Sequence, residues 1–574
     1  MNFIKKNLLY ILFVISIFFA GFFLRFYHLS NIPNGLYADE TAIGYNAYSI
    51  LVTGRDEYGK FLPLYFRSFD DYKLPVYIYA TAGAIKLFSL NAFAVRFPSM
   101  LAGSLAVVAI YFLILELSRK KWLAALTSLF LAFNPWNTFF SRSGYEVNLA
   151  TFLMLLGTLF FVMAVKRKNN FFIFILSVST FLLSVYTYNV TRLISPLMFM
   201  TLAIFYYRSI TVNSKNIFIA IMVLFFIGML PFFITFITLQ SQSGFSSHED
   251  ALLTGKEVGA KIIEIKSYFV GLPSIVSKIA FNYWFLVLWM YVKNLVSFFS
   301  TNFFFTIGPD HPNENIGGGF GMFYYFEFPL MLLGAYKIVK EKISYLYPFC
   351  LWFIVLFLAG SIIKDVPNGT RTYPVIIPLI VFSSYGMYFL IKKIMSVKNI
   401  FFKRSLLFAC VGIVVYSYIF YFTSYFIRFP VEYAKEWRSE DQRLVTYIDS
   451  IEKKYNKVVF DDSAEFFYTD LLFYGKYPPQ FYQSNAKYRM NGLVNVLESV
   501  GKYEFRKIDW KRDMPTPGTL FVTGSGNVPE NKKPLAVFSY PTRPVVIYYD
   551  RKIGQIPVTD IAYEVFESDW NSGR

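Results

Sequence analysis

Long apolar runs alternate with short polar segments through the first three quarters of the chain. Runs of about 20 mostly apolar residues are long enough to cross a bilayer as a helix. They begin near residues 8, 97, 122, 149, 171, 193, 216, 324, 345, 373 and 405. Two further apolar segments, 74–90 and 279–300, are interrupted by Lys, Asn or Tyr. The pattern predicts an all-α polytopic membrane domain in which two segments have an ambiguous place.

The distribution of basic residues decides between the two possible topologies. If segments 74–90 and 279–300 do not span, every second loop is basic, as expected of loops on the cytoplasmic side. These loops contain Lys5/Lys6, Arg119/Lys120/Lys121, Lys166/Arg167/Lys168, Arg208/Lys215, Lys337/Lys340/Lys342 and Lys392/Lys393/Lys398/Lys403/Arg404. If both segments spanned, three of these loops would move outside. We therefore predict about 11 transmembrane helices, an N-terminus inside, a C-terminus outside, and two helices along the outer surface.

Composition supports a membrane protein and excludes several other classes. Of the 574 residues 55% are hydrophobic and 16% are charged, whereas soluble domains average about 25% charged residues. The net charge of +18 comes from short clusters between apolar runs, which does not favour nucleic-acid binding. Cys350 and Cys410 both lie in apolar runs, so neither a disulfide framework nor a Cys-rich metal site is expected. The first apolar run follows a basic head without a convincing cleavage site, which favours an uncleaved first helix.

The unusual polar stretches fall in loops that this topology places outside, at residues 28–96, 141–148, 239–322 and 364–372. The first contains two adjacent acids, Asp39 and Glu40, just past a hydrophobic segment. The third ends in "GPDHPNENIGGGFG", and the fourth reads "KDVPNGTRTYP". The opposite face shows only basic anchors, so we expect a polar substrate to be handled at the outer face.

From about residue 429 the composition becomes that of a soluble domain. "QRLVTYIDSIEKKY" has apolar residues at helical spacing, whereas "KVVFDD", "TLFVTG" and "PVVIYYD" are typical of short strands. We predict a transmembrane domain over residues 1–428 and a small extracytoplasmic α/β domain over residues 429–574.

Three stretches of the first outer region resemble the polytopic glycosyltransferases of the GT-C superfamily. They are "LRFYHLSNIPNGLYADETAIGYNAYSIL", "DDYKLPVYIY" and "NAFAVRFPSMLAGSLAV". The resemblance is to the branch of the protein O-mannosyltransferases and aminoarabinose transferases, family 39-like, and continues through "FNPWNTFFSRSGYEVN", "HPNENIGGGFGMFYYFEFPLMLLG" and "VPNGTRTYPVIIPL". It implies a multi-pass enzyme of the plasma membrane that moves a sugar from a polyprenyl-phosphate carrier to an acceptor at the outer face, with inversion.

The acid pair carries the predicted chemistry. Because the phosphate of such a donor is already a good leaving group, the main need is a base for the acceptor's proton and cations for the phosphate. The resemblance places the catalytic base at Asp39 and a residue that orients the acceptor, or Asp39 itself, at Glu40. The alternative is that Asp39 merely caps a surface helix, "ADETAIGYNAYSIL".

Other outer-loop residues are candidates for substrate binding. The resemblance implies a carrier-phosphate cation at Arg371, whose alternative is a snorkelling anchor, and a loop over the active site around His311, hinged at glycines 317–319. Lys73 and Asp71 lie beside the "KLP" that opens the segment 74–90.

Glu146 and Arg142 are two further candidates for substrate binding. The resemblance matches Glu146 to an acid of the related oligosaccharyltransferases, and the alternative is that Glu146 simply pairs with Arg142. Those enzymes have a further acid two residues on, where this chain has Asn148. Since a divalent metal would want several hard oxygen ligands, we expect a reaction without a cofactor or metal.

Two other functions remain open from the sequence. A lipid-sugar transporter or flippase would need ionisable residues near the bilayer midplane and repeated halves, and neither is visible. A membrane scaffold for the C-terminal domain is the second alternative, although that domain shows no recognisable catalytic motif. The sugar, the acceptor (protein, lipid or cell-wall glycan) and any partners beyond the donor and membrane lipid stay open.

Overall fold

The computed structural model describes most of the chain, in two compact units. The described residues are 2–69, 71–167, 170–210, 218–231, 234, 255–268, 275, 282–362, 366–461, 467–491, 494–524, 528–529, 532–542, 545–549, 552–556 and 560–568. Unit 1 comprises Met1–Arg25, Leu101–Ser141 and Tyr145–Tyr421, and unit 2 comprises Phe26–Met100, Arg142–Gly144 and Phe422–Arg574.

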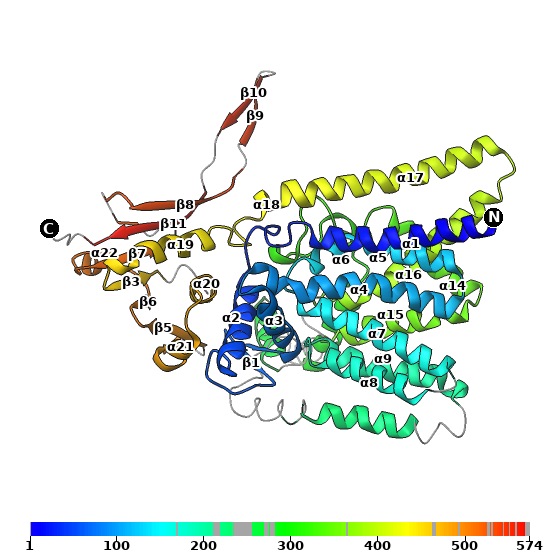
Figure 1. The fold of residues 1–574 in the computed structure, drawn as a ribbon, viewed down its shortest axis with the longest axis horizontal. Coiled ribbons are helices and arrows are strands. Elements are labelled where there is room, and N and C mark those ends of the chain that lie inside the picture. The colour runs from blue at the N-terminus through cyan, green and yellow to red at the C-terminus, as the bar shows by residue number, and fades with distance from the viewer. Residues whose placement is uncertain are drawn as a thin grey trace. The chain divides into compact units, whose positions relative to one another are not determined.

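Unit 1 is built from helices that run alongside one another (Figure 1). The helices with most or all of their residues in this unit are α1 (Asn2–Phe26), α4 (Ala92–Ser118), α5 (Lys121–Phe133), α6 (Pro135–Ser141), α7 (Glu146–Lys166), α8 (Phe171–Val185), α9 (Thr191–Tyr206), α11 (Gly255–Tyr268), α13 (Tyr283–Ser297), α14 (Glu327–Lys340), α15 (Tyr347–Gly360), α16 (Ile376–Met395) and α17 (Ile400–Thr423). The apolar runs predicted to span correspond to helices, and the ambiguous segments become α3 (Pro75–Phe88) and α13.

Among the described residues, five helices are long and apolar enough to cross a membrane. They are Leu8–Phe26, Ala92–Ser118, Glu146–Lys166, Tyr373–Met395 and Ile400–Glu432. Four further apolar helices are shorter: Lys121–Phe133, Phe171–Val185, Phe218–Pro231 and Ser344–Gly360. A proline explains one shortening, because Pro135 begins a new helix and disfavours helical backbone at the residue before it. The multi-pass helical architecture is confirmed, whereas the number of spans and their orientation stay predictions.

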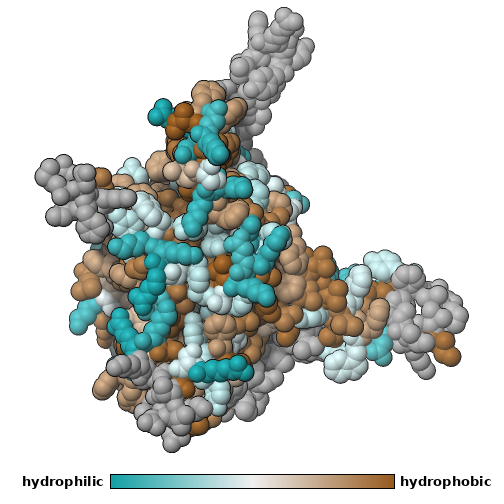
Figure 2. All heavy atoms as spheres, turned by 90° about the vertical axis from the view of Figure 1, so that its right-hand side faces the viewer, coloured by the Kyte–Doolittle hydropathy of each residue, from teal (hydrophilic) through white to brown (hydrophobic). Residues whose placement is uncertain are grey.

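Several basic loops gather at one end of unit 1. Lys120 Nζ donates to the hydroxyl of Tyr345, between α14 and α15, at 2.7 Å. Lys166, at the end of α7, donates to the carbonyl of Glu116 in α4. The hydroxyl of Tyr10 in α1 donates to the carbonyl of Lys121 at 2.8 Å. Figure 2 shows hydrophilic side chains gathered on the face that looks toward the viewer, with hydrophobic surface around them. Three of the loops that the positive-inside pattern assigned to one side, around residues 120, 166 and 342, therefore share one end of the bundle.

Unit 2 combines the first outer loop with the C-terminal segment. The loop contributes α2 (Ala38–Thr53), the hairpin β1 (Phe66–Ser68) and β2 (Asp71–Lys73), and α3. The C-terminal segment contributes α18 (Phe429–Glu432), α19 (Asp441–Ile451), α20 (Phe467–Tyr474), α21 (Pro479–Asn485), α22 (Trp510–Asp513) and a seven-stranded sheet of order β4-β5-β6-β3-β7-β11-β8.

The seven strands of this sheet, and a separate hairpin, confirm the predicted α/β character of the C-terminal segment. They are β3 (Lys457–Phe460), β4 (Lys487–Asn491), β5 (Val494–Val500), β6 (Tyr503–Phe505), β7 (Thr519–Thr523), β8 (Ala536–Tyr540) and β11 (Asp560–Glu567), with β9 (Val545–Tyr549) and β10 (Lys552–Ile556) in the hairpin. Strand β3 pairs in parallel with β6 and β7, and the remaining pairs are antiparallel.

Helix α2 packs against the C-terminal segment. Tyr45 belongs to the hydrophobic core of that segment and donates from its hydroxyl to the carbonyl of Tyr477 at 3.2 Å. The hydroxyls of Thr41 and Thr469 are 2.9 Å apart. At Gly44 a Cβ atom would lie 2.4 Å from the ring of Phe473, so only glycine allows this approach. Helix α2 is therefore buried along most of its length, and the alternative of a surface helix is wrong because the C-terminal segment covers it.

Candidate active site

The first turn of α2 holds the predicted base. The helix begins at Ala38 after Tyr37, which has extended backbone and makes no side-chain capping bond. Asp39 therefore lies inside the first turn of the helix and not at the N-cap. The helix dipole favours an acid in this first turn. Its carboxylate is 2.8 Å from Lys73 Nζ, and the Asp39 side chain is 43% exposed whereas the Lys73 side chain is 10% exposed. The capping alternative is wrong, and the base assignment stays a prediction.

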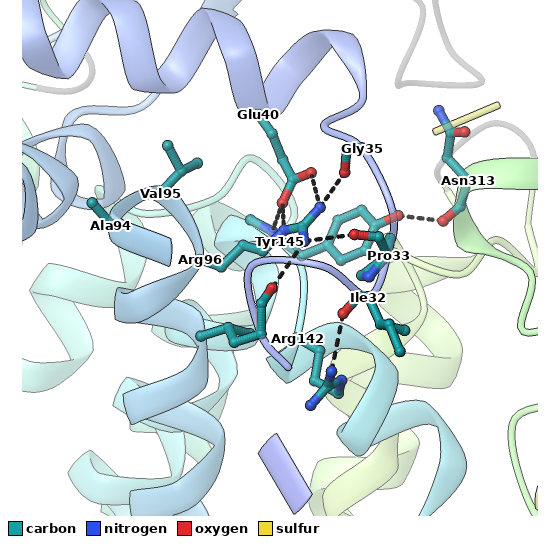
Figure 3. Close-up of polar contacts among 12 residues, drawn as sticks. Ile32, Pro33, Gly35, Glu40, Ala94, Val95, Arg96, Arg142, Tyr145 and Asn313 are labelled. Carbon is teal, nitrogen blue, oxygen red and sulfur yellow. Dashed lines mark hydrogen bonds and ion pairs between the residues drawn. The ribbon is translucent and has the colours of Figure 1, made fainter. Parts of the chain in front are cut away.

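Glu40, the second acid of the pair, is held in a different environment. Its side chain and that of Arg96 are both fully buried, and the two groups form a bidentate pair with N–O distances of 2.9 and 3.1 Å. The backbone N–H of Gly144 donates to the same carboxylate at 2.7 Å. Figure 3 shows Glu40 and Arg96 directed at one another. The geometry favours a positioning role, in which Glu40 fixes the turn that presents Asp39.

Arg96 also ties down the segment that leads into α2. Its Nη1 donates to the carbonyls of Leu29 and Pro33 at 3.0 and 2.9 Å, and its Nη2 donates to the carbonyl of Gly35. With the two bonds to Glu40, all five N–H groups of the guanidinium are used. This role was not predicted from the sequence, although an arginine within the apolar stretch "NAFAVRFPSM" is a signal for it, since a buried charge requires partners.

A second buried arginine, Arg142, reinforces the same segment. Its Nη2 donates to the carbonyl of Ile32 at 3.0 Å (Figure 3) and to the carbonyl of His28 at 3.3 Å. Its guanidinium lies over the ring of Phe426 at 4.9 Å, within cation–π range. Arg142 was predicted to bind substrate. Its complete burial favours positioning of the loop before Asp39.

The hairpin β1–β2 carries the other two candidates of the first loop. Lys73 pairs in register with Phe66, and Asp71 pairs with Ser68. The short antiparallel pair therefore holds the lysine backbone in place while its ammonium reaches Asp39. The binding roles predicted for Lys73 and Asp71 are not tested by this geometry.

In unit 1, Glu314 joins two of the predicted outer loops. Its Oε1 accepts from the Thr370 hydroxyl at 2.8 Å, and its Oε2 accepts from the Gly369 N–H at 2.7 Å. Burial raises the pKa of Glu314, and the Thr370 hydrogen bond and the charges of His311 and Arg371 oppose this. His311 and Arg371, predicted from separate loops, are thus brought to one neighbourhood. The role of Glu314 was not predicted from the sequence, in which the residue is one acid in the polar stretch "HPNEN".

The same two loops are anchored on the start of α7 and on α6. The hydroxyl of Tyr145 donates to the carbonyl of Asn313 at 2.5 Å, and the indole of Trp136 donates to the carbonyl of Gly369 at 3.2 Å. Glu146 is the first residue of α7 and its first-turn acid. Asn148, which replaces the acid expected in a metal-binding relative, is buried and accepts from the Tyr373 hydroxyl at 2.8 Å.

The described residues contain no group of three or more His, Cys, Asp or Glu side chains that could hold a metal ion. Glycines 317, 318 and 319 all have positive φ, between 72° and 78°, a region that favours glycine. Their role as a hinge stays a prediction.

Residues 15–180 match the family model described as dolichyl-phosphate-mannose-protein mannosyltransferase. No curated protein matches the chain. The matched range contains Asp39, Glu40, Lys73, Arg96 and Arg142, all of which lie in unit 2. The predicted resemblance to the mannosyltransferase branch of the GT-C superfamily is therefore confirmed for the part of the chain that holds the acid pair.

Solved structures are similar to this protein over most of its chain. An oligosaccharyltransferase from Archaeoglobus fulgidus, tethered with an acceptor peptide, matches with a TM-score of 0.50 at 13% identity, over 83% of this chain and 64% of that one. ArnT from Cupriavidus metallidurans in the apo state gives a TM-score of 0.49 at 11% identity, over 98% of both chains. ArnT bound to undecaprenyl phosphate gives 0.48 at 12% identity, over 99% of both chains. The likeness to the oligosaccharyltransferase shows a shared fold, and the chain spans about two thirds of that protein's length.

Proposed function

We propose that the chain is an inverting glycosyltransferase that moves a sugar from a polyprenyl-phosphate carrier to an acceptor at the outer face of the plasma membrane. The observation that carries the proposal is the environment of Asp39. This carboxylate is accessible on a rigidly held helix turn, inside the segment that matches the mannosyltransferase model. The class of donor follows from the description of that family.

The proposed reaction needs one base and one leaving group. The acceptor hydroxyl oxygen attacks the anomeric carbon from the face opposite the phosphate, while its proton passes to the Asp39 carboxylate. The bond between the anomeric carbon and the phosphate oxygen breaks, and its electron pair leaves with the polyprenyl phosphate. One displacement of this kind inverts the anomeric configuration. General-base catalysis of this type contributes roughly 100- to 10,000-fold to a rate.

Cations of the chain stabilise the leaving phosphate in this proposal. Lys73, 2.8 Å from Asp39, orients the carboxylate before the donor binds and supplies an ammonium beside the scissile bond. Arg371 is the second phosphate cation, because its planar guanidinium can bind two phosphate oxygens. The surroundings of the two acids support a reaction without a metal. Glu40 is paired with Arg96 and Asp39 with Lys73, so both carboxylates already have a cationic partner.

The C-terminal segment takes part in building this site. Because Tyr45 and Thr41 of α2 pack on it, removing residues 430–574 would expose the apolar face of the helix that presents Asp39. Loss of activity in such a truncation would therefore not distinguish an enzyme from a scaffold, and point variants are the better test.

The test is donor consumption by the purified full-length chain in detergent. A panel of polyprenyl-phosphate sugars is supplied with candidate acceptors, and released polyprenyl phosphate is measured with and without EDTA. We expect release that survives EDTA and a product with inverted anomeric configuration by NMR. Glu432, a partly exposed acid paired with Arg428, provides a matched control, and Glu432→Gln should release the carrier at the wild-type rate. No release from any donor would contradict the transferase assignment, and a product with retained configuration would contradict the single displacement.

A further inference from the structure

An open groove lies in the C-terminal part of unit 2, away from the residues discussed above. Its volume is about 1120 Å³. It is lined by Lys507, Ile508, Asp509, Trp510, Lys511, Met514, Pro515, Val528, Pro529 and Lys532. This is ample for a ligand larger than a single small molecule, since typical small-molecule sites measure roughly 300–1,000 Å³.

The topology of the sheet places the groove where α/β sheets bind ligands. Strands β6 and β7 flank β3 and run parallel to it, and the groove residues follow the carboxyl ends of β6 and β7. Strand β6 lies on one side of β3, and the chain then crosses to β7 on the other side. Strand β3 is therefore the point at which the strand order of the sheet reverses. Crevices outside the carboxyl ends of strands at such a point are the preferred ligand sites. Asp461, directly after β3, accepts from the N–H of the lining residue Ile508 at 3.0 Å.

The wall of the groove combines an aromatic surface with apolar neighbours. The ring of Trp510 is anchored edge-on against Phe521 and Phe566, with centroids 5.5 and 5.4 Å away. Met514 and Pro515 continue the apolar surface beside it. An indole held in this way offers a rigid surface to a ligand at little entropic cost.

The rim of the groove is positively charged. Lys507 and Lys511 are exposed and form no ion pair with any residue that the structure describes. Asp513 pairs with Arg506 at 2.7 Å, and Asp509, the one acid among the lining residues, accepts from the backbone N–H of Lys511 at 3.2 Å. Lys532 adds a third ammonium, tethered to the carbonyl of Glu567. The lining residues thus carry three lysines and one acid, a net positive charge that favours an acidic ligand.

We propose that this groove binds an acidic saccharide, a glycan whose rings carry carboxylate or phosphate groups. A sugar ring is rigid and presents an apolar C–H face, which suits the Trp510 surface, while acidic groups at the ring edge reach the lysines. An acidic peptide supplies charge but has flexible side chains and no apolar face beside its carboxylates, so it loses more entropy on binding. The proposal that a ligand binds here rests on the shape and lining of the groove alone. The choice of a saccharide rests on the proposed function, because the acceptor of a glycosyltransferase can itself be a glycan.

The test measures binding to the purified full-length chain by calorimetry. The probes are tetragalacturonate, with a carboxylate on every ring, the neutral maltotetraose, and the acidic peptide tetraglutamate. The test variant is Lys507→Gln with Lys511→Gln. The matched control is Lys453→Gln with Lys454→Gln, two exposed lysines of the same part of the chain outside the groove.

We expect tetragalacturonate to bind and maltotetraose to bind at least fivefold more weakly. The groove variant should weaken tetragalacturonate at least fivefold, since each exposed ion pair contributes modestly. The control should change the Kd less than twofold, and added salt should weaken binding. No binding of tetragalacturonate, equal weakening in the control, or tighter binding of tetraglutamate would each overturn the proposal.

Donor consumption separates this proposal from the proposed function. In the absence of an acceptor, water takes the sugar and the donor is hydrolysed, and the groove variant should release polyprenyl phosphate in this hydrolysis at the wild-type rate. Saccharide binding in a chain that consumes no donor would contradict the proposed function but not the groove. Donor consumption in a chain that binds no saccharide would contradict the groove proposal but not the proposed function.

Discussion

The fully buried pair of Glu40 and Arg96 makes a sharp prediction about stability. Glu40→Gln keeps the shape of the side chain and removes its charge. With its oxygen in the place of Oε1, the glutamine can still accept two of the three hydrogen bonds that reach Glu40, those from Arg96 Nε and from the Gly144 N–H. The amide NH₂ group, however, must face a guanidinium that has only donors. The arginine charge is then buried without a counter-charge.

The expected magnitude follows from the burial. Breaking a buried ion pair by removing one partner costs about 3–5 kcal/mol, whereas an exposed i,i+4 pair contributes about 0.3–0.5 kcal/mol. For a unit of this size, the buried case corresponds to a drop in Tm of roughly 10 °C. Arg96→Lys should cost at least as much, because lysine has three donors and cannot also hold the carbonyls of Leu29, Pro33 and Gly35.

The assay is thermal unfolding of the purified variants in one detergent, followed by intrinsic fluorescence. Glu432→Gln is the control, since Glu432 pairs with Arg428 on the surface, with side chains 33% and 43% exposed. We expect this control to stay within about 2 °C of wild type. If Glu40→Gln is as stable as Glu432→Gln, the buried pair does not hold the loop before α2 and the reasoning is refuted.

Three other predictions concern topology, the donor and pH. In a chain with both native cysteines replaced by alanine, Asp310→Cys should react with an impermeant thiol reagent added outside and Ser396→Cys should not; both positions are exposed, and the reverse pattern would contradict the orientation. Arg371→Lys should raise the apparent KM for the donor roughly tenfold by losing the bidentate contact, and Arg371→Ala should raise it far more. Near-normal kinetics in both variants would favour the alternative, in which Arg371 is only an anchor at the membrane surface. Burial raises the pKa of Glu57 from 4.5 to about 8. The folded chain thus binds this proton more tightly than the unfolded chain, and stability should fall as pH rises from about 4.5 to 8. The Tm of Glu57→Gln should fall less between pH 5 and pH 8.5 than the Tm of the wild-type chain. If the Tm of the two proteins changes with pH in parallel, Glu57 does not titrate in this way.

The local elements of the fold could be predicted from the sequence. A run of apolar residues without interruption has few options other than a membrane helix, and helices α4, α7 and α16 follow the predicted runs. The helix over "QRLVTYIDSI" and the strands at 457 and 519 likewise follow from periodicity and β-branched content. The two acids were found because adjacent charges beside an apolar run are unusual.

The long-range contacts could not be predicted. The different roles of Asp39 and Glu40 depend on Arg96, which lies 56 positions from Glu40 in the sequence. Nothing in the local sequence indicates which of the two acids pairs with this arginine. Thr41 and Thr469 meet across 428 positions, so the burial of α2 depends on a segment that the sequence treats as a separate domain. Glu314 reads as an ordinary loop acid until the loop around Thr370 is folded against it.

The most direct measurement is donor turnover by Asp39→Asn, made together with donor binding. The substitution keeps the shape of the side chain and removes the base. We predict turnover roughly 100-fold or more below wild type, with the donor Kd unchanged and with Glu432→Gln fully active. Turnover of Asp39→Asn near the wild-type rate would contradict the assignment of Asp39 as the base that accepts the acceptor's proton.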